Sequence, residues 1–180
     1  MLKKASAIIV VILVIFTLIW ICCPITERQV ATVEKAIVVI QPAQGYNVSG
    51  KVTFTNIEEG IKISADIQGL TPGKHGFHIH EFGDLSAKDF TSAGGHFNPM
   101  EKPHGRPQDK NRHVGDLGNI VADSTGTAQY ERVDKMISLN GIYSILGRAI
   151  IIHKNEDDFV SQPTGNAGPR VAGGVIGIAQ

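Results

Sequence analysis

Residues 61–68 read IKISADIQ, and this short stretch decides the class of fold. Apolar and polar residues alternate along it without a break, so every second side chain falls on the same face. This period of two is typical of a β-strand with one buried and one solvated face. The preceding residues 48–56 alternate in the same way, with Val52 and Phe54 on their apolar side. The turn sequence that ends at Gly60 separates the two stretches, which predicts two neighbouring strands.

Further β-rich runs follow at near-even spacing, separated by turns such as Thr71-Pro72-Gly73. These runs cover residues 34–40, 76–82, 117–122, 127–133, 144–153 and 171–179. No helical period is found after the first 25 residues. We therefore expect an all-β fold, an antiparallel sandwich or barrel, in a single domain. Two long loops interrupt the rhythm, one between residues 80 and 117 and one over residues 154–170.

The first 25 residues form an apolar head. Lys3 and Lys4 open it, and no charged residue lies between positions 5 and 25. This length suffices to cross a bilayer, and the lysines place the N-terminus in the cytoplasm. We expect either a membrane anchor or a signal peptide that is cleaved or lipidated. The chain would then be exported, facing the periplasm or the extracellular side. Residues 26–33 would form a tether and residues 34–180 the folded domain.

Charge and cysteine content narrow the chemistry of that domain. Removing Lys3 and Lys4 from the 17 basic residues leaves 15 against 17 acidic residues. This balance gives no reason to expect a nucleic acid partner. The only cysteines, Cys22 and Cys23, lie in the apolar head. The folded domain therefore has no disulfide and no thiolate, and any metal ligands in it must be nitrogen or oxygen.

Six of the seven histidines lie between residues 75 and 116. His78 and His80 are two apart in GFHIHEF, so both rings should point to the same side of a strand. His75 has the opposite parity and should hydrogen-bond backbone as a structural residue. The other candidate ligands are His96, His104, His113 and Asp116 in the first long loop, and His153 at the end of a later strand. Because one strand ends at His80 and another at His153, we expect both loops and these two strand ends on one side of the barrel, and the site there.

Each of these residues also has an ordinary explanation. An HxH pair can be a surface accident, loop histidines are often merely exposed, and Asp116 could cap a turn three residues after His113. Together, however, seven nitrogen and oxygen ligands exceed what one four-coordinate zinc ion takes. The set predicts two metals, one bound by imidazoles alone, which suits copper, and one by histidine and aspartate, which suits zinc.

Five segments, GFHIHEFGD, TSAGGHFNP, RHVGDLGN, GRAIIIH and TGNAGPR…GVIGIAQ, resemble the copper–zinc superoxide dismutases. The resemblance covers residues 34–180 and implies an eight-stranded antiparallel Greek-key β-barrel. Copper would be bound by His78, His80, His96 and His153. Zinc would be bound by His96, His104, His113 and Asp116. His96 would bridge both metals.

The resemblance also implies an activity and further site residues. The chain would convert two superoxide anions to O2 and H2O2 while copper cycles between Cu(II) and Cu(I), with His96 delivering a proton. Arg170 would guide the anion, and Thr164 would line its channel. Asp157 would join a copper histidine to a zinc histidine, unless it is only one acid of an exposed run. The alternative function is a copper- and zinc-binding module of the same fold without turnover.

The sequence departs from the resemblance at several places. Many relatives link the first loop to the last strand with a disulfide, but the matching positions here are Phe90 and Gly173. The missing cross-link could cost about 2–4 kcal/mol of stability unless packing, for example of Phe90, compensates. The second loop is shorter than in many relatives and lacks their extra charges before Thr164. The C-terminal GVIGIAQ and the GDLSA segment at residues 83–87 resemble the two-fold contact of dimeric relatives, so we expect a homodimer.

Overall fold

The computed structural model describes residues 32–180. The predicted anchor or signal segment, residues 1–25, and nearly all of the predicted tether lie outside the described residues. Within residues 32–180, no helix is both long enough and apolar enough to cross a membrane.

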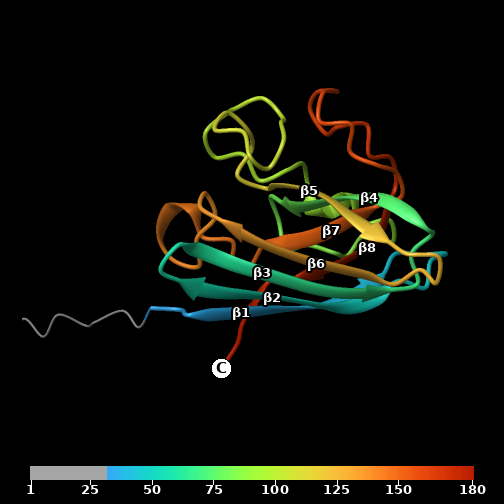
Figure 1. Cartoon of the computed structure of the whole chain (residues 1–180), viewed down its shortest axis with the longest axis horizontal. Helices are drawn as coiled ribbons and strands as arrows, with labels where there is room; N and C mark the ends of the chain where they lie inside the picture. The colour runs from blue at the N-terminus through green and yellow to red at the C-terminus, as the bar shows by residue number, and fades with distance from the viewer. Residues whose placement is uncertain (1–31) are drawn as a thin grey trace, which may run out of the picture. The chain divides into compact units, whose positions relative to one another are not determined.

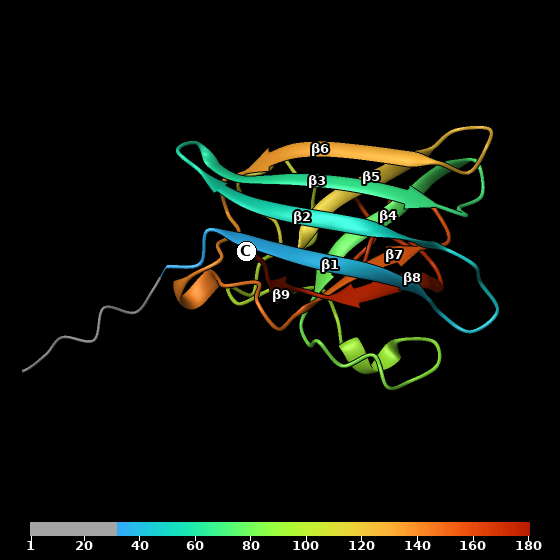
Figure 2. The ribbon, with the colours of Figure 1, turned by 90° about the horizontal axis from the view of Figure 1, so that it is seen from below.

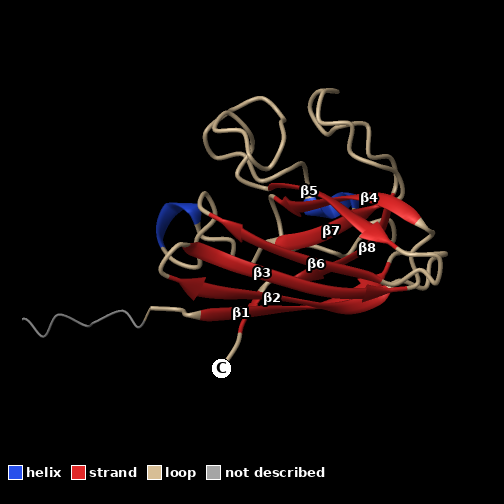
Figure 3. Cartoon of the chain, in the orientation of Figure 1, coloured by secondary structure: helices blue, strands red, loops and turns tan. Residues whose placement is uncertain are grey.

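The described residues form nine β-strands and two short 3-10 helices (Figures 1 and 3). The strands are β1 (Lys35–Pro42), β2 (Ser49–Ile57), β3 (Gly60–Gln68), β4 (Gly73–His80), β5 (Asp116–Ala122), β6 (Ala128–Asp134), β7 (Ala149–His153), β8 (Arg170–Val175) and β9 (Gly177–Ile178). The helices are η1 (Thr91–Ala93) and η2 (Gly141–Tyr143). The all-β expectation is confirmed, with β9 as a two-residue addition that pairs with β1.

Eight strands close into an antiparallel barrel. The sheet order runs β2-β3-β6-β5-β4-β7-β8-β1, and a further pairing of β1 with β2 completes the ring (Figure 2). The order departs from the chain sequence where β3 neighbours β6 and β4 neighbours β7, which is a Greek-key connection. The eight-stranded Greek-key barrel expected from the sequence is therefore confirmed.

The alternation in β2 and β3 builds one wall of the core. Ile63 of β3 faces Phe54 of β2 in register, and both side chains are fully buried. Their polar neighbours Lys62 and Thr55 lie on the other face of the same strands. Because the side-chain period of a strand is two, this register places Val52 and Phe54 of β2 on the core side together with the four apolar residues of β3.

The run 144–153 was predicted as one strand, and this is wrong for its first half. The strand begins only at Ala149, because Gly147 adopts a positive φ of 74° and the Arg148 N–H donates to the Ile145 carbonyl in a turn. Ile145 is nevertheless fully buried in the core. An apolar run thus continued into the core without continuing as a strand. The final run is interrupted at the buried Ile176, whose backbone hydrogen-bonds Gly147 and Arg148.

Phe90 and Gly173 lie against each other, where a disulfide would have linked the first loop to the last strands. A Cβ atom on Gly173 would be 3.3 Å from Phe90 Cδ2. The Phe90 side chain is buried in a small apolar cluster with Ala43, Ala93, Ala149 and Ile151. The aromatic ring therefore fills the space beside Gly173 and attaches the loop to the barrel by packing, as the sequence suggested it could.

We expect Phe90→Ala to lower the free energy of unfolding by about 3–5 kcal/mol, because it empties a buried ring position. Ile142→Ala is the matched control, since the Ile142 side chain is 82% exposed and its truncation should change little. Denaturant unfolding of both metal-free variants measures the difference. Equal midpoints for the two variants would show that Phe90 packing does not hold the loop.

Candidate metal centre

Strand β4 divides its side chains between the core and a second, outer face. Phe77 and Ile79 belong to the main apolar core, as their parity predicts. His78 and His80 alternate with them and therefore point to the other side of the sheet. Both histidines are nonetheless buried, because the long loops cover this outer face. His75 hydrogen-bonds the backbone carbonyls of His153 and Thr71, which confirms its predicted structural role.

The pairing of β4 with β7 brings the last histidine to the same face. The register is antiparallel and places Phe77 opposite Ile152 and His80 opposite Ala149. His80 and His153 thus end their strands at opposite ends of the pair. The sequence argument that both strand ends would lie together is therefore wrong. The two loops leave from opposite ends and fold back over one face, above β4 and β5 in Figure 1.

One cluster on this face consists of four buried histidines. Their ring nitrogens lie within 4.8 Å of one another in His78, His80, His96 and His153. His80 Nε2 and His153 Nε2 face each other at 3.3 Å. His78 Nδ1 and His96 Nε2 are buried without a hydrogen-bond partner among the described residues. A buried, unpartnered nitrogen is costly, whereas a cation at the centre would accept its lone pair.

The opposite ring nitrogen of three of these histidines is held by an acceptor. His78 Nε2 lies 2.8 Å from Asp157 Oδ2, and the Nδ1 atoms of His80 and His153 lie 2.9 Å from the Gly94 and Gly168 carbonyls. An N–H donated outwards leaves a lone pair on the inward nitrogen, which is the tautomer a metal needs.

The same histidines are neutral in the metal-free fold. Burial lowers the pKa of His78 and of His80 well below the usual imidazole value, and neighbouring imidazoles lower it further. Burial likewise lowers the pKa of His153 to about 4. For His96, burial outweighs the contacts with Asp116 and also lowers the pKa. Neutral imidazoles offer their lone pairs without first losing a proton.

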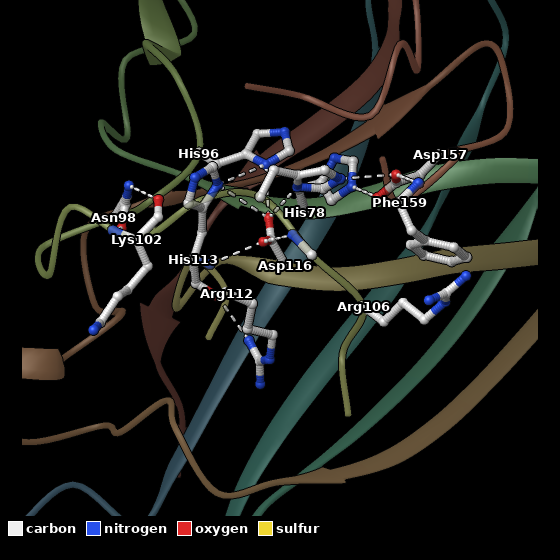
Figure 4. Close-up of polar contacts among 12 residues, drawn as sticks. His78, His96, Asn98, Lys102, Arg106, Arg112, His113, Asp116, Asp157 and Phe159 are labelled. Atoms are coloured by element: carbon white, nitrogen blue, oxygen red, sulfur yellow. Dashed lines mark hydrogen bonds and ion pairs between the residues drawn. The ribbon is translucent and has the colours of Figure 1, made fainter. Parts of the chain in front are cut away.

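A second cluster shares His96 and adds residues of the first loop. Its members are His96, His104, His113 and Asp116, all buried. Asp116 Oδ1 lies 2.8 Å from His96 Nδ1, 2.9 Å from His104 Nδ1 and 3.3 Å from His113 Nδ1. Figure 4 shows His96 and His113 beside this carboxylate. The other oxygen, Oδ2, accepts the backbone N–H groups of Gly105 and His113. Asp116 therefore caps the turn, as its ordinary explanation held, and also faces the rings.

The donor sets fit two different metals. Four imidazole nitrogens suit copper, whereas three imidazoles and one carboxylate suit zinc. The ligand atoms of a tetrahedral zinc site lie about 3.3 Å apart. His113 Nδ1 is 3.5 Å from His96 Nδ1 and 3.3 Å from Asp116 Oδ1. His96 turns Nδ1 to one cluster and Nε2 to the other, so it can serve both.

Asp157 joins the two clusters by contacting one histidine of each on the ring nitrogen that faces away from the cluster. Its carboxylate is fully buried and reaches His78 Nε2 at 2.8 Å and His104 Nε2 at 2.9 Å. Its backbone exchanges hydrogen bonds with the Asn119 side chain on β5. Asp157 thus differs from its exposed neighbours Glu156 and Asp158, and it lies where the sequence predicted a bridging carboxylate.

Arg170 lies beside the four-histidine cluster. It pairs with His153 across the β7–β8 ladder and is half-buried. Its guanidinium donates to the Phe90 carbonyl and, at 2.6 Å, to the Gly94 carbonyl, which also accepts from His80. Thr164 is half-buried, but no hydrogen bond among the described residues joins it to either cluster.

Sequence reasoning missed the ion pair that supports the first loop. The buried Arg112 guanidinium lies 2.5 Å from Asp134 Oδ2 and donates to the carbonyls of Pro107, His113 and Val114. Arg112 directly precedes a candidate zinc ligand, so this network fixes the backbone of the second cluster. The position of Arg112 inside RHVGDLGN was the only signal in the sequence for a structural role. Its partner could not be predicted, because Asp134 lies on β6, far from Arg112 in the chain.

Comparisons with known proteins agree with this geometry. The family model described as copper/zinc superoxide dismutase (SODC) matches residues 48–176. The chain is 43% identical over 164 residues to an extracellular superoxide dismutase [Cu-Zn] of Brugia pahangi, which covers 86% of this chain and 82% of that protein. It also resembles the crystal structure of the clock protein EA4, with a TM-score of 0.79 and 45% identity over 86% of this chain and all of the other. The chain therefore belongs to the copper/zinc superoxide dismutase family, an enzyme family whose cofactors are copper and zinc.

Proposed function

We propose that the two clusters form one active centre that converts two superoxide anions and two protons to O2 and H2O2. The observation that carries this proposal is the position of Arg170. Its guanidinium shares the Gly94 carbonyl with His80, so a fixed positive charge lies beside the four-histidine cluster. A metal store needs no cation there, whereas an enzyme with an anionic substrate does.

The bound metals would supply the redox chemistry and would hold the shared histidine ring in place. His78, His80, His96 and His153 would hold copper, which would supply one-electron redox chemistry. His96, His104, His113 and Asp116 would hold zinc, which has no redox chemistry and would supply structural support for the shared ring. The chain's own residues then have three tasks. They attract the anion, orient it and provide a proton.

Arg170 performs the first two tasks. Two backbone carbonyls hold its guanidinium, which fixes its direction before the anion arrives. A planar guanidinium stays charged at any physiological pH and can bind two oxygens at once. The second loop adds little long-range attraction, because its exposed cation Lys154 is outnumbered by the exposed Glu156 and Asp158, of which Glu156 pairs with Lys74 on β4. Within the second loop and β8, Arg170 is therefore the cation that attracts the anion.

His96 performs the third task. Its Nε2 faces the four-histidine cluster and has no hydrogen-bond partner among the described residues. Its Nδ1 is fixed on the side of Asp116, so the ring can hold a proton at Nε2 without turning. We assign to Nε2 the proton that is delivered to the reduced anion. Thr164 would line the approach, and Asp157 would keep the His78 and His104 rings in place.

Export and membrane attachment belong to the same proposal. The domain would comprise residues 34–180, preceded by the anchor or signal segment over residues 1–25 and a tether over residues 26–33. The Brugia pahangi relative is described as extracellular, which supports export. An uncleaved anchor would hold the domain at the membrane, and cleavage would release it on the periplasmic or extracellular side. Mass spectrometry of the N-terminus of the exported chain decides between the two.

A homodimer is proposed from one apolar surface. Three exposed apolar side chains lie on β1, β8 and β9, which are neighbours in the sheet and in Figure 2, and a fourth lies in the segment after β4. They are Val39, Phe82, Val175 and Ile178. Gly83 packs closely on Val175, since a Cβ there would be 3.2 Å from Val175 Cγ1. A second copy of the same surface would cover these side chains.

The first prediction of this proposal separates catalysis from metal storage. His80→Ala removes a copper ligand and should abolish both copper retention and dismutation. Arg170→Ala should retain copper but slow the reaction roughly 10- to 100-fold, since one close charge pair contributes about 1–4 kcal/mol. Copper content and the rate of superoxide decay are measured on both variants and on the control Lys154→Ala, which removes an exposed cation of the second loop. An inactive wild-type domain with both metals bound would favour the alternative, a non-catalytic binding module.

The second prediction concerns protons released by zinc. Burial lowers the pKa of His104, but its hydrogen bonds to Asp116 and Asp157 outweigh burial and raise it to about 9. Below that pH the metal-free protein carries a proton on His104 that zinc must displace. Zinc affinity should therefore rise with pH, up to about tenfold per unit, and level off near pH 9.

Calorimetry of zinc binding to the copper-free protein at pH 7.5 should show release of about one proton. The measurement compares buffers that have different ionisation enthalpies. A binding enthalpy independent of the buffer would contradict the assigned protonation of His104.

The third prediction tests the dimer. Ile178→Asp places a charge on the proposed apolar surface and should convert a dimer to a monomer with unchanged metal content. Val121→Asp is the control, because Val121 is exposed on β5, outside the proposed contact. Light scattering at micromolar concentration reads the mass of each variant. A monomeric wild-type domain at that concentration would exclude the proposed dimer.

A further inference from the structure

The side chain of Gln162, in the second loop, forms two hydrogen bonds with the backbone of His104 in the first loop. The His104 N–H donates to Gln162 Oε1 at 2.8 Å, and Gln162 Nε2 donates to the His104 carbonyl at 3.0 Å. The two residues are 58 positions apart in the chain. A side-chain amide carries a donor and an acceptor side by side, so it can satisfy both backbone groups of one residue. Neither a carboxylate nor an ammonium group can do so.

The same loop also holds the ring of His104. Asp157 Oδ1 lies 2.9 Å from His104 Nε2, on the side of the ring away from Asp116. His104 is therefore held at its ring by Asp157 and at its backbone by Gln162. A third contact between the loops lies nearby, where the Arg106 guanidinium is 5.7 Å from the centre of the Phe159 ring (Figure 4).

Fixing the backbone at His104 affects more than one contact of the zinc-type cluster. His104 presents Nδ1 to Asp116 Oδ1, and the next residue, Gly105, donates its N–H to Asp116 Oδ2. Both contacts depend on where the backbone of these two residues lies. No other side chain among the described residues hydrogen-bonds either backbone group of His104.

We propose that Gln162 is a positioning residue that sets the geometry of the zinc-type cluster from the second loop. Through its two hydrogen bonds to His104, Gln162 ties the second loop, which also carries Thr164, to that cluster. The inference rests on the proposed zinc site, but it concerns a residue that touches neither cluster with its own ligand atoms. It gives the shortened second loop a function that does not depend on charge.

The test is the rate at which zinc leaves the fully loaded protein. Gln162→Ala should release zinc to an excess of a coloured chelator at least about tenfold faster than wild type, the usual effect of losing an outer partner of a ligand. Gln108→Ala is the matched control, an exposed glutamine of the first loop with no side-chain hydrogen bond among the described residues. Gln162→Glu keeps the acceptor but loses the donor, and should also release zinc faster than wild type.

Two further measurements separate positioning from general destabilisation. Copper release and the unfolding midpoint of the metal-free protein should match those of Gln108→Ala. If zinc left Gln162→Ala as slowly as it left the control, or if copper and zinc were released faster by the same factor, the inference would be wrong. Failure of the wild-type domain to bind zinc at all would overturn the proposed function instead.

Discussion

The antiparallel register between β4 and β7 is the constraint on which the centre depends. It places Phe77 and Ile152 opposite each other, with Phe77 and Ile79 facing the core and His78 and His80 facing away. A slip of one residue would turn the histidines inward and the apolar side chains outward. The hydrophobic core therefore sets the direction of the copper-type ligands before any metal is present. The loops then only have to cover the face of the sheet from which these histidines project.

Covering that face has an electrostatic cost that the carboxylates offset only in part. Asp116 and Asp157 are both fully buried, and between them they contact four histidine rings. Three imidazole contacts hold the pKa of Asp116 well below its usual range although burial alone would raise it. The inward nitrogens of His78 and His96 have no hydrogen-bond partner within residues 32–180. The metal-free fold thus keeps unsatisfied atoms at one place, and metal binding there stabilises the native state directly.

The sequence predicted most of the fold, because alternation reports which face of a strand is buried. It also predicted which residues would converge, since ligand types in a Gly- and Pro-rich loop have few other uses. It failed where a property depends on the path of the backbone. The turn at Gly147 shortened β7, and the antiparallel pairing separated the strand ends at His80 and His153. The contacts of Arg112 with Asp134 and of Gln162 with His104 join distant segments, and no local pattern marks them.

Replacing a cross-link by packing changes how Arg170 is held. A disulfide acts mainly on the unfolded chain and persists when the surrounding packing opens, whereas a buried ring stabilises only the native arrangement. Here the carbonyl of Phe90 accepts from Arg170, and the ring of Phe90 packs beside Gly173. Any opening that withdraws the ring therefore also withdraws a support of the guanidinium. Because residues 32–180 contain no cysteine, this support is insensitive to thiol reduction and instead follows the temperature dependence of apolar burial.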